Sequence, residues 1–191
     1  NSNIAVGEIL EVLSATKTAV RKVYAQDDTV TYLISVVNSG SVPLNGLTLE
    51  DNLGMYAFAT TTLTPLSYVA DTINYYVNGV LQPKPTVAAG APLTVSGLNI
   101  PAGGNALLVY ETKPTEYAPM AEESEITNTA TISGGGITPV NVKESIQALS
   151  EPVLTITKSV SPVPVTENGT LTYTFLVQNN GHHRRISSGI S

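Results

Sequence analysis

The sequence predicts an all-β protein, an antiparallel β-sandwich with Greek-key connections. Three observations lead to this fold class. Short segments alternate apolar and polar residues with a period of two, residues typical of turns (Gly, Pro and Asn) separate them, and no segment has a convincing helical period. Many short strands of this kind bury their apolar faces by packing two sheets against each other.

The expected strands follow one another from near the start of the chain to residue 148. Between two of them, Asn78-Gly79 is the strongest short hairpin signal in the chain. Pro83, Pro85 and Pro92 keep the next segment out of any central strand. Strands of an Ig-like sandwich are expected at 11–19, 29–38, 47–53, 72–77, 80–82, 93–100, 105–112, 125–133 and 140–148.

A stretch near the start of the chain recurs near its end. Segment 16–40 matches segment 157–181 without a gap, so that Lys158 repeats Lys17 141 positions later. A self-match at a fixed spacing, in a chain rich in Thr, Val and turn residues, indicates tandem β modules. We therefore expect a complete sandwich module in 1–149, the truncated first strands of a second module in 150–181, and a non-native or disordered tail in 182–191.

The composition excludes several classes of partner and site. A net charge of −6 and a charged fraction of 13% argue against nucleic acid and against an anionic membrane surface. The absence of cysteine excludes disulfides and thiolate metal sites, and no apolar run reaches the length of a membrane span. We expect no cofactor and no metal, since His182 and His183 lie in the tail, which we interpret as vector-derived or frameshifted.

Three polar residues occupy positions where the alternation requires apolar ones. They are Lys17, Asp51 and Asn128, and each has apolar residues two positions before and after it. A buried charge or amide without a partner costs several kcal/mol. Three such positions, holding one amine, one carboxyl and one amide, indicate that the side chains meet in the core.

An amine, an acid and an amide in a dry core can react with one another. Burial favours the neutral Lys, which is nucleophilic, and the neutral carboxylic acid, which can donate a hydrogen bond. We expect Asp51 to polarise the side-chain carbonyl of Asn128, the Lys17 amine to attack it, and ammonia to leave. The product is an isopeptide bond, formed once per molecule and without turnover, so the protein is not expected to be an enzyme.

A purely structural role is the alternative. Lys17 and Asp51 can form an ion pair, Lys17 can reach solvent from a strand end, and Asn128 can cap a sheet edge. The chemical hypothesis also predicts that Lys158 stays unreacted, because the second module lacks its acid and its Asn.

Several motifs, in this order and spacing, carry a resemblance to known families: Thr16-Lys17 and the segments 28–32, 37–40, 47–53 and 126–132. They resemble the repeat domain of bacterial surface proteins called domain-of-unknown-function family eleven. They also resemble the stalk and pilin domains of Gram-positive adhesins, such as the collagen-binding adhesins. The resemblance covers about residues 11–133, and its beginning recurs at 152–181.

In the adhesin domains that this chain resembles, a first-strand Lys is bonded to a last-strand Asn beside an Asp or Glu. The resemblance therefore implies that Lys17 is the nucleophile, Asn128 the acceptor and Asp51 the acid. Glu111 is a rival for the acid, because segment 109–112 resembles the Glu-Thr segment of another adhesin subtype. The run around it is apolar on both faces, so its orientation stays open.

The function that these features predict is a structural stalk module of a bacterial protein at the cell surface or in the cell wall, with neighbouring modules of the same protein as partners. The alternative is a binding module whose loops, such as 54–71 or 113–124, hold a host glycan or matrix protein. Strands within 152–181 lack partners, so we expect them to be disordered or to pair with another chain.

Overall fold

The structure is a computed structural model that describes residues 12–149, 154–161 and 167–179. These residues form strands, turns and bends without a helix, which confirms the all-β fold class. Nothing in the described ranges is a helix long and apolar enough to cross a membrane. The strands are β1 (Leu13–Ala19), β2 (Val23–Tyr24), β3 (Val30–Asn38), β4 (Leu44–Asp51), β5 (Tyr56–Phe58), β6 (Thr61–Leu63), β7 (Leu66–Tyr68), β8 (Asn74–Val77), β9 (Val80–Leu81), β10 (Thr86–Ala88), β11 (Leu93–Ile100), β12 (Asn105–Pro114), β13 (Glu125–Ser133), β14 (Val140–Ala148), β15 (Leu154–Ser161) and β16 (Thr172–Asn179).

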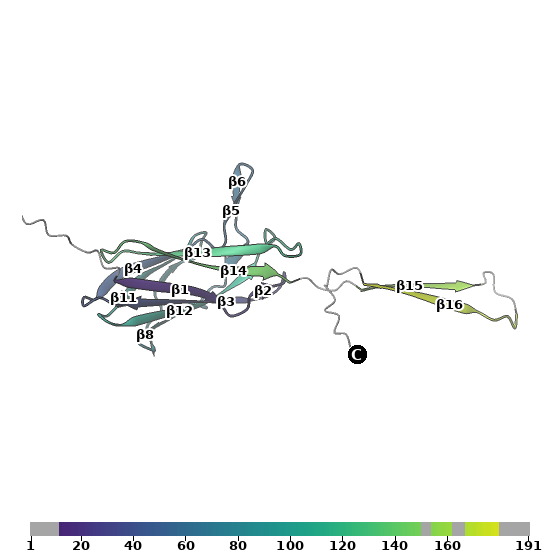
Figure 1. Cartoon of the computed structure of the whole chain (residues 1–191), viewed down its shortest axis with the longest axis horizontal. Coiled ribbons are helices and arrows are strands. Elements are labelled where there is room, and N and C mark those ends of the chain that lie inside the picture. Colours follow the sequence, from purple (N-terminus) through teal and green to yellow (C-terminus); the bar gives the residue numbers. More distant parts are fainter. Residues whose placement is uncertain (1–11, 150–153, 162–166, 180–191) are drawn as a thin grey trace, which may run out of the picture.

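Two sheets of six strands pack face to face (Figure 1). The first sheet has the order β1-β3-β12-β8-β9, and β7 pairs with the end of β12. The second has the order β10-β11-β4-β13-β14-β2. Neighbours are antiparallel except β2, which runs parallel to β14. Strand β1 therefore belongs to one sheet, and β4 and β13 lie side by side in the other.

The core forms between the two inner faces, where alternate residues of each strand are buried as the period of two requires. Strand β3 buries five residues of its inner face, the apolar or aromatic Val30, Tyr32, Ile34 and Val36 and the polar Asn38. Among the largest fully buried side chains are three tyrosines, Tyr24, Tyr32 and Tyr110. The core of this sandwich is thus apolar but carries several hydroxyl groups.

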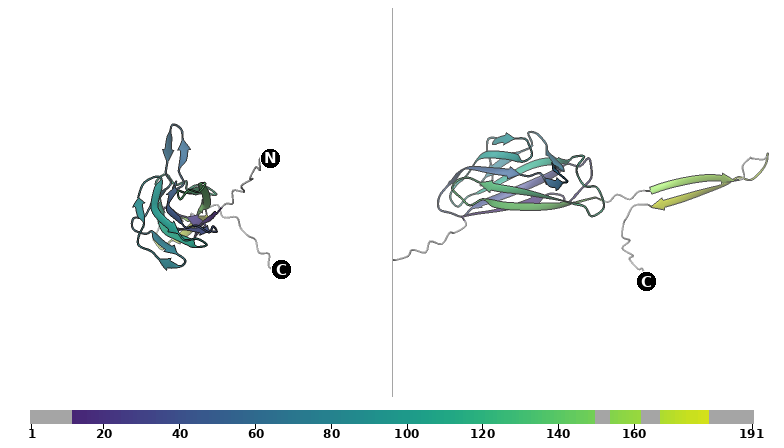
Figure 2. Two further views of the ribbon diagram at one scale, coloured as in Figure 1. Left: turned by 90° about the vertical axis from the view of Figure 1, so that its left-hand side faces the viewer. Right: turned by 90° about the horizontal axis from the view of Figure 1, so that it is seen from above.

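Some elements differ from the sequence-based expectation. Between β4 and β8, where no strand was expected, the chain forms three short strands, β5, β6 and β7. Of these, β5 and β6 form a hairpin that projects from the sandwich (Figures 1 and 2). The proline-rich segment contains β10, which pairs only with β11 and lies at the edge of its sheet. That position agrees with the exclusion of proline-flanked segments from central strands. Strand β4 ends at Asp51, so that Leu53, expected in the strand, lies in the following turn with φ of +52°.

The second copy of the repeat forms a hairpin with the same register as the first. Lys17 pairs with Ile34 between β1 and β3, and Lys158 pairs with Phe175 between β15 and β16. Among the described strands, β15 and β16 pair only with each other, and Figure 2 shows them as a separate two-stranded ribbon. The tail predicted at 182–191 and the first residues of the predicted module, 1–11, lie outside the described residues.

Candidate functional site

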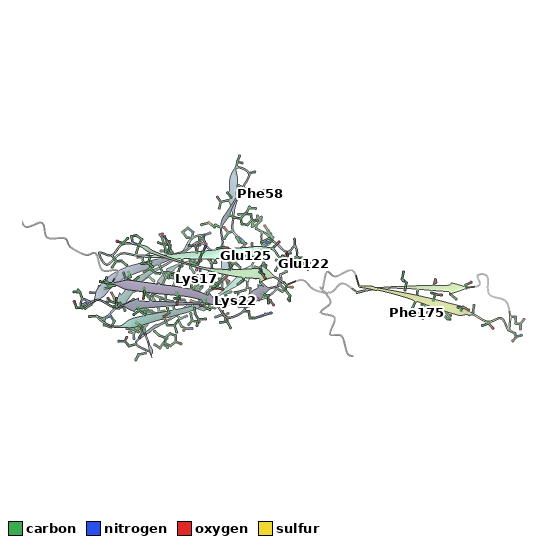
Figure 3. All side chains as sticks on the ribbon, in the orientation of Figure 1. Lys17, Lys22, Phe58, Glu122, Glu125 and Phe175 are labelled. Atoms are coloured by element: carbon green, nitrogen blue, oxygen red, sulfur yellow. The ribbon has the colours of Figure 1, made fainter. Side chains whose placement is uncertain are left out.

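The structure places Lys17, Asp51 and Asn128 together between the two sheets. Lys17 projects from the middle of β1, Asp51 ends β4, and Asn128 lies in β13. Their exposed fractions are 5%, 0% and 0%. In Figure 3 Lys17 is labelled on the body of the sandwich, whereas Phe58 stands on the projecting hairpin. The site therefore joins strands of opposite sheets in a space closed to solvent.

Neighbouring strands fix the position of the acid. Asp51 pairs with Ala130 of β13, which is two residues from Asn128 and on the same inner face. Oδ1 of Asp51 accepts a hydrogen bond of 2.8 Å from the Leu53 backbone N–H. This turn at the end of β4 leaves the other carboxylate oxygen, Oδ2, free to face the core.

Oδ2 of Asp51 is the centre of the cluster. Lys17 Nζ lies 2.7 Å from it, and Asn128 Nδ2 lies 3.5 Å from the same atom. The Tyr110 hydroxyl also donates to it. Burial lowers the pKa of Lys17 below its usual value, and the adjacent charge of Asp51 opposes part of this shift. The site thus favours a neutral amine more than water does.

The orientation of Asn128 differs from the expectation that the acid faces its carbonyl. Asp51 contacts the amide nitrogen instead, while Oδ1 of Asn128 is buried and has no hydrogen-bond partner among the described residues. An ionised carboxylate can only accept hydrogen bonds, so the amide presents its N–H to it. In this arrangement the acid is positioned to act on the leaving nitrogen and not on the carbonyl oxygen.

Two tyrosines that the sequence analysis did not single out complete the site. Tyr32 and Tyr110 pair across β3 and β12, and their rings stack with centroids 5.9 Å apart. Lys17 Nζ lies 4.9 Å from the centroid of the Tyr32 ring, within cation–π range. Burial, together with the charge of Asp51, raises the pKa of Tyr110 well above its usual value. The repeat held a signal for one of them, because Tyr173 stands where Tyr32 stands in the first copy.

The rival acid is not part of the cluster. Tyr110 and Thr112 on either side of Glu111 are fully buried, so Glu111 projects from the opposite, outer face of β12. The apolar run before it left this orientation open in the sequence. A different glutamate lies closer, because Glu144 of β14 pairs directly with Asn128 and its charge raises the pKa of Lys17 slightly. Glu144 itself forms an ion pair with Lys22 at the rim.

The structure also bears on the purely structural roles that the sequence left open for Lys17, Asp51 and Asn128. Lys17 and Asp51 do form an ion pair, but Lys17 lies mid-strand with its side chain fully buried, so it does not reach solvent. Asn128 lies in β13 between β4 and β14, and not at a sheet edge. Lys158 is exposed and lies 4.4 Å from the centroid of the Tyr173 ring, which repeats the Lys-over-Tyr contact of the first copy. In the described part of the chain no group of three or more His, Cys, Asp or Glu could hold a metal ion.

Solved structures with this architecture include bacterial pilins. An Asp-to-Ala variant of BcpA, the major pilin subunit of Bacillus cereus, aligns with a TM-score of 0.56 at 12% identity over 88% of this chain and 56% of the pilin. Unmodified BcpA aligns with a TM-score of 0.51 at 13% identity over 75% of this chain and 42% of the pilin. The chain thus spans about half the length of these pilins. At such identities the likeness shows a shared fold, the Ig-like β-sandwich.

No protein-family model matches the sequence, and no curated protein matches it. The resemblance to domain-of-unknown-function family eleven is therefore not confirmed. The likeness to pilin folds rests on the structures alone.

Proposed function

We propose that the chain is a structural stalk module of a bacterial cell-surface protein, stabilised by a self-formed isopeptide bond between Lys17 and Asn128. One observation carries the chemical part. The amine and the amide nitrogen of two strands in opposite sheets contact the same oxygen of Asp51, in a site without solvent exposure. Held this way, the two groups are preorganised for an intramolecular reaction.

The reaction balances with these three side chains alone. Lys17 passes a proton from its ammonium group to Asp51, across the 2.7 Å hydrogen bond. The neutral amine attacks Cγ of Asn128 and forms a C–N bond. Asp51 then gives its proton to the departing Nδ2, the Cγ–Nδ2 bond breaks, and ammonia leaves. The new amide nitrogen returns its extra proton to Asp51.

A bond between β1 and β13 suits a stalk. These strands belong to different sheets, so the link holds the two layers together covalently. In a protein without cysteine it takes the place that disulfides have in other extracellular domains. The shared fold of the pilins, the repeat of the first strands at 154–179 and this link together support a load-carrying module at the cell surface, with further modules of the same protein as its neighbours.

Intact mass spectrometry tests the proposal. The chain should weigh one ammonia less than its sequence requires, and a tryptic digest should contain one peptide that joins the segments around Lys17 and Asn128. Lys17→Ala should restore the full mass. Lys158→Ala is the matched control, since it removes the repeated lysine and should leave the mass loss unchanged.

A second candidate is a binding module, because the two loops named from the sequence meet in the structure. The Tyr56 hydroxyl donates to the Tyr117 carbonyl at 3.0 Å, and the Thr115 hydroxyl donates to the Thr64 carbonyl at 2.7 Å. Both loops line a groove of about 530 Å³ whose lining carries no charged residue. Screening the chain on arrays of neutral glycans and matrix proteins, with Tyr117→Ala as control, distinguishes this function from a stalk alone.

A further inference from the structure

Two buried polar atoms of the site lack hydrogen-bond partners. They are the Tyr32 hydroxyl and Oδ1 of Asn128, the only such side-chain atoms among the described residues, and both residues are completely buried. Buried donors and acceptors are nearly always paired, because an unmade hydrogen bond in a dry core costs stability. One of these atoms is a donor and the other an acceptor, so a single bond would satisfy both.

The two groups are neighbours. Tyr32 lies on β3 with its ring beneath Lys17 Nζ, at 4.9 Å from the ring centroid. Burial raises the pKa of Tyr32 most and the charge of Asp51 raises it further, whereas the Asn128 amide lowers it, as an N–H near the phenol oxygen does. The Asn128 amide is thus within reach of the hydroxyl, although the two are not hydrogen-bonded in this structure.

The acid cannot serve both ends of the amide. Oδ2 of Asp51 faces Lys17 Nζ and Asn128 Nδ2, where it can take one proton and deliver it to the leaving nitrogen. When the amine attacks Cγ, an electron pair moves onto Oδ1 of Asn128, away from Asp51. A donor aimed at that oxygen lowers the barrier of such acyl transfers. Tyr110 is not available for it, because its hydroxyl is bound to Asp51.

We propose that Tyr32 is a further catalytic residue of the bond-forming reaction. Its hydroxyl donates a hydrogen bond to Oδ1 of Asn128 as the tetrahedral intermediate forms. This inference rests on the proposed function. The hydroxyl keeps its proton throughout: it donates a hydrogen bond while negative charge is on Oδ1, and the charge returns to the carbonyl when Nδ2 leaves as ammonia. The buried, unpaired state of both atoms before reaction leaves this hydrogen bond to be made in the transition state.

Tyr32→Phe tests the role, because it keeps the ring that stacks on Tyr110 and removes only the hydroxyl. The full chain is made in a timed cell-free synthesis, samples are denatured at intervals, and the fraction that has lost ammonia is measured by intact mass. We expect Tyr32→Phe to form the bond about 10- to 1,000-fold more slowly than the unaltered chain. Tyr75→Phe is the matched control. Tyr75 lies in the same sheet as Tyr32, its hydroxyl donates to the Asn99 carbonyl at 2.6 Å, and the variant should react at the unaltered rate.

A second measurement separates chemistry from folding. In a Lys17→Met background, where no bond can form, Tyr32→Phe should leave the Tm unchanged or raise it, because the hydroxyl has no partner to lose. A slow Tyr32→Phe chain that is also destabilised in this background would assign the effect to folding and overturn the inference. Equal rates for Tyr32→Phe and the unaltered chain would overturn it and leave the proposed function intact. An unaltered chain that never loses ammonia would overturn both.

Discussion

Lys17 Nζ lies 2.7 Å from Oδ2 of Asp51, although the two residues belong to opposite sheets of the sandwich. This contact is fully buried, and removing two charges from water costs more than their attraction returns unless further hydrogen bonds satisfy them. Asp51 collects such bonds from Leu53, Tyr110 and Asn128. The first sheet is therefore held to the second through a buried polar centre. Its desolvation costs free energy, and the hydrogen bonds to Asp51 offset part of that cost.

Removing the acceptor should reveal how much the crosslink stabilises the module. Asn128→Ala keeps the ion pair but prevents the bond, and a link that closes a loop of roughly 100 residues is worth about 4 to 5 kcal/mol. We expect a loss of this size in the free energy of unfolding, measured with guanidinium chloride. Thr129→Ala, on the outer face of the same strand, should change stability by less than about 0.5 kcal/mol. A loss of about 1 kcal/mol or less in Asn128→Ala would mean that no crosslink was there to remove.

Replacing each acid separately decides which one acts. Asp51→Asn keeps the shape of the side chain but can no longer take a proton from Lys17 and pass it to the leaving nitrogen. We expect this variant to retain its full mass. Glu111→Gln should lose ammonia like the unaltered chain, because Glu111 lies on the outer face of β12. Full mass in Glu111→Gln, with ammonia lost in Asp51→Asn, would reverse the assignment.

The lowered pKa of Lys17 predicts a pH dependence in chains that cannot react. In Asn128→Ala the unfolded chain binds the Lys17 proton up to the ordinary pKa of 10.5, whereas the folded chain releases it at lower pH. Stability rises with pH wherever the unfolded state holds more protons. The free energy of unfolding of Asn128→Ala should therefore rise relative to that of Asn128→Ala/Lys17→Met, between the lowered pKa and 10.5. A constant difference over that window would show that burial does not shift the pKa of this amine.

The second hairpin should determine self-association. Its exposed apolar side chains include Val160, Tyr173, Phe175 and Leu176. A lone two-stranded hairpin is marginal in water, and its edges can pair with other strands. Sedimentation should find larger species for the whole chain than for a chain ending at residue 149. If the whole chain and the shortened chain both sediment as monomers, the hairpin does not cause self-association.

Much of the sandwich could be predicted because its faces alternate strictly. The segment 125–133 reads as a strand from its own pattern, and the structure has β13 with these bounds. The burial of Lys17, Asp51 and Asn128 followed from the same alternation, because each interrupts an apolar face. Short strands such as β5, β6 and β7 escaped prediction, since three residues are too few to show a period.

The orientation of the side chains in the site was harder to predict than the three residues, Lys17, Asp51 and Asn128, that form its centre. Which end of the Asn128 amide faces Asp51 depends on hydrogen bonds made across strands, and no local pattern encodes them. Tyr32 and Tyr110 look like ordinary core aromatics in the sequence. The pairing of β1 with β3 brings Tyr32 to Lys17, and the pairing of β3 with β12 places Tyr110 beside Tyr32, where its hydroxyl donates to Asp51. The sequence did not show which face of its strand Glu111 occupies, because the run before it is apolar on both faces. In the structure the burial of Tyr110 and Thr112 places Glu111 on the outer face of β12.

The intact mass of the purified chain tests the central claim most directly. If Lys17 and Asn128 react, the measured mass is one ammonia below the value calculated from the sequence, and Lys17→Ala abolishes the difference while Lys158→Ala does not. A chain that shows the full calculated mass after folding would contradict the account, and the Lys17–Asp51 contact would then be an unreacted buried ion pair.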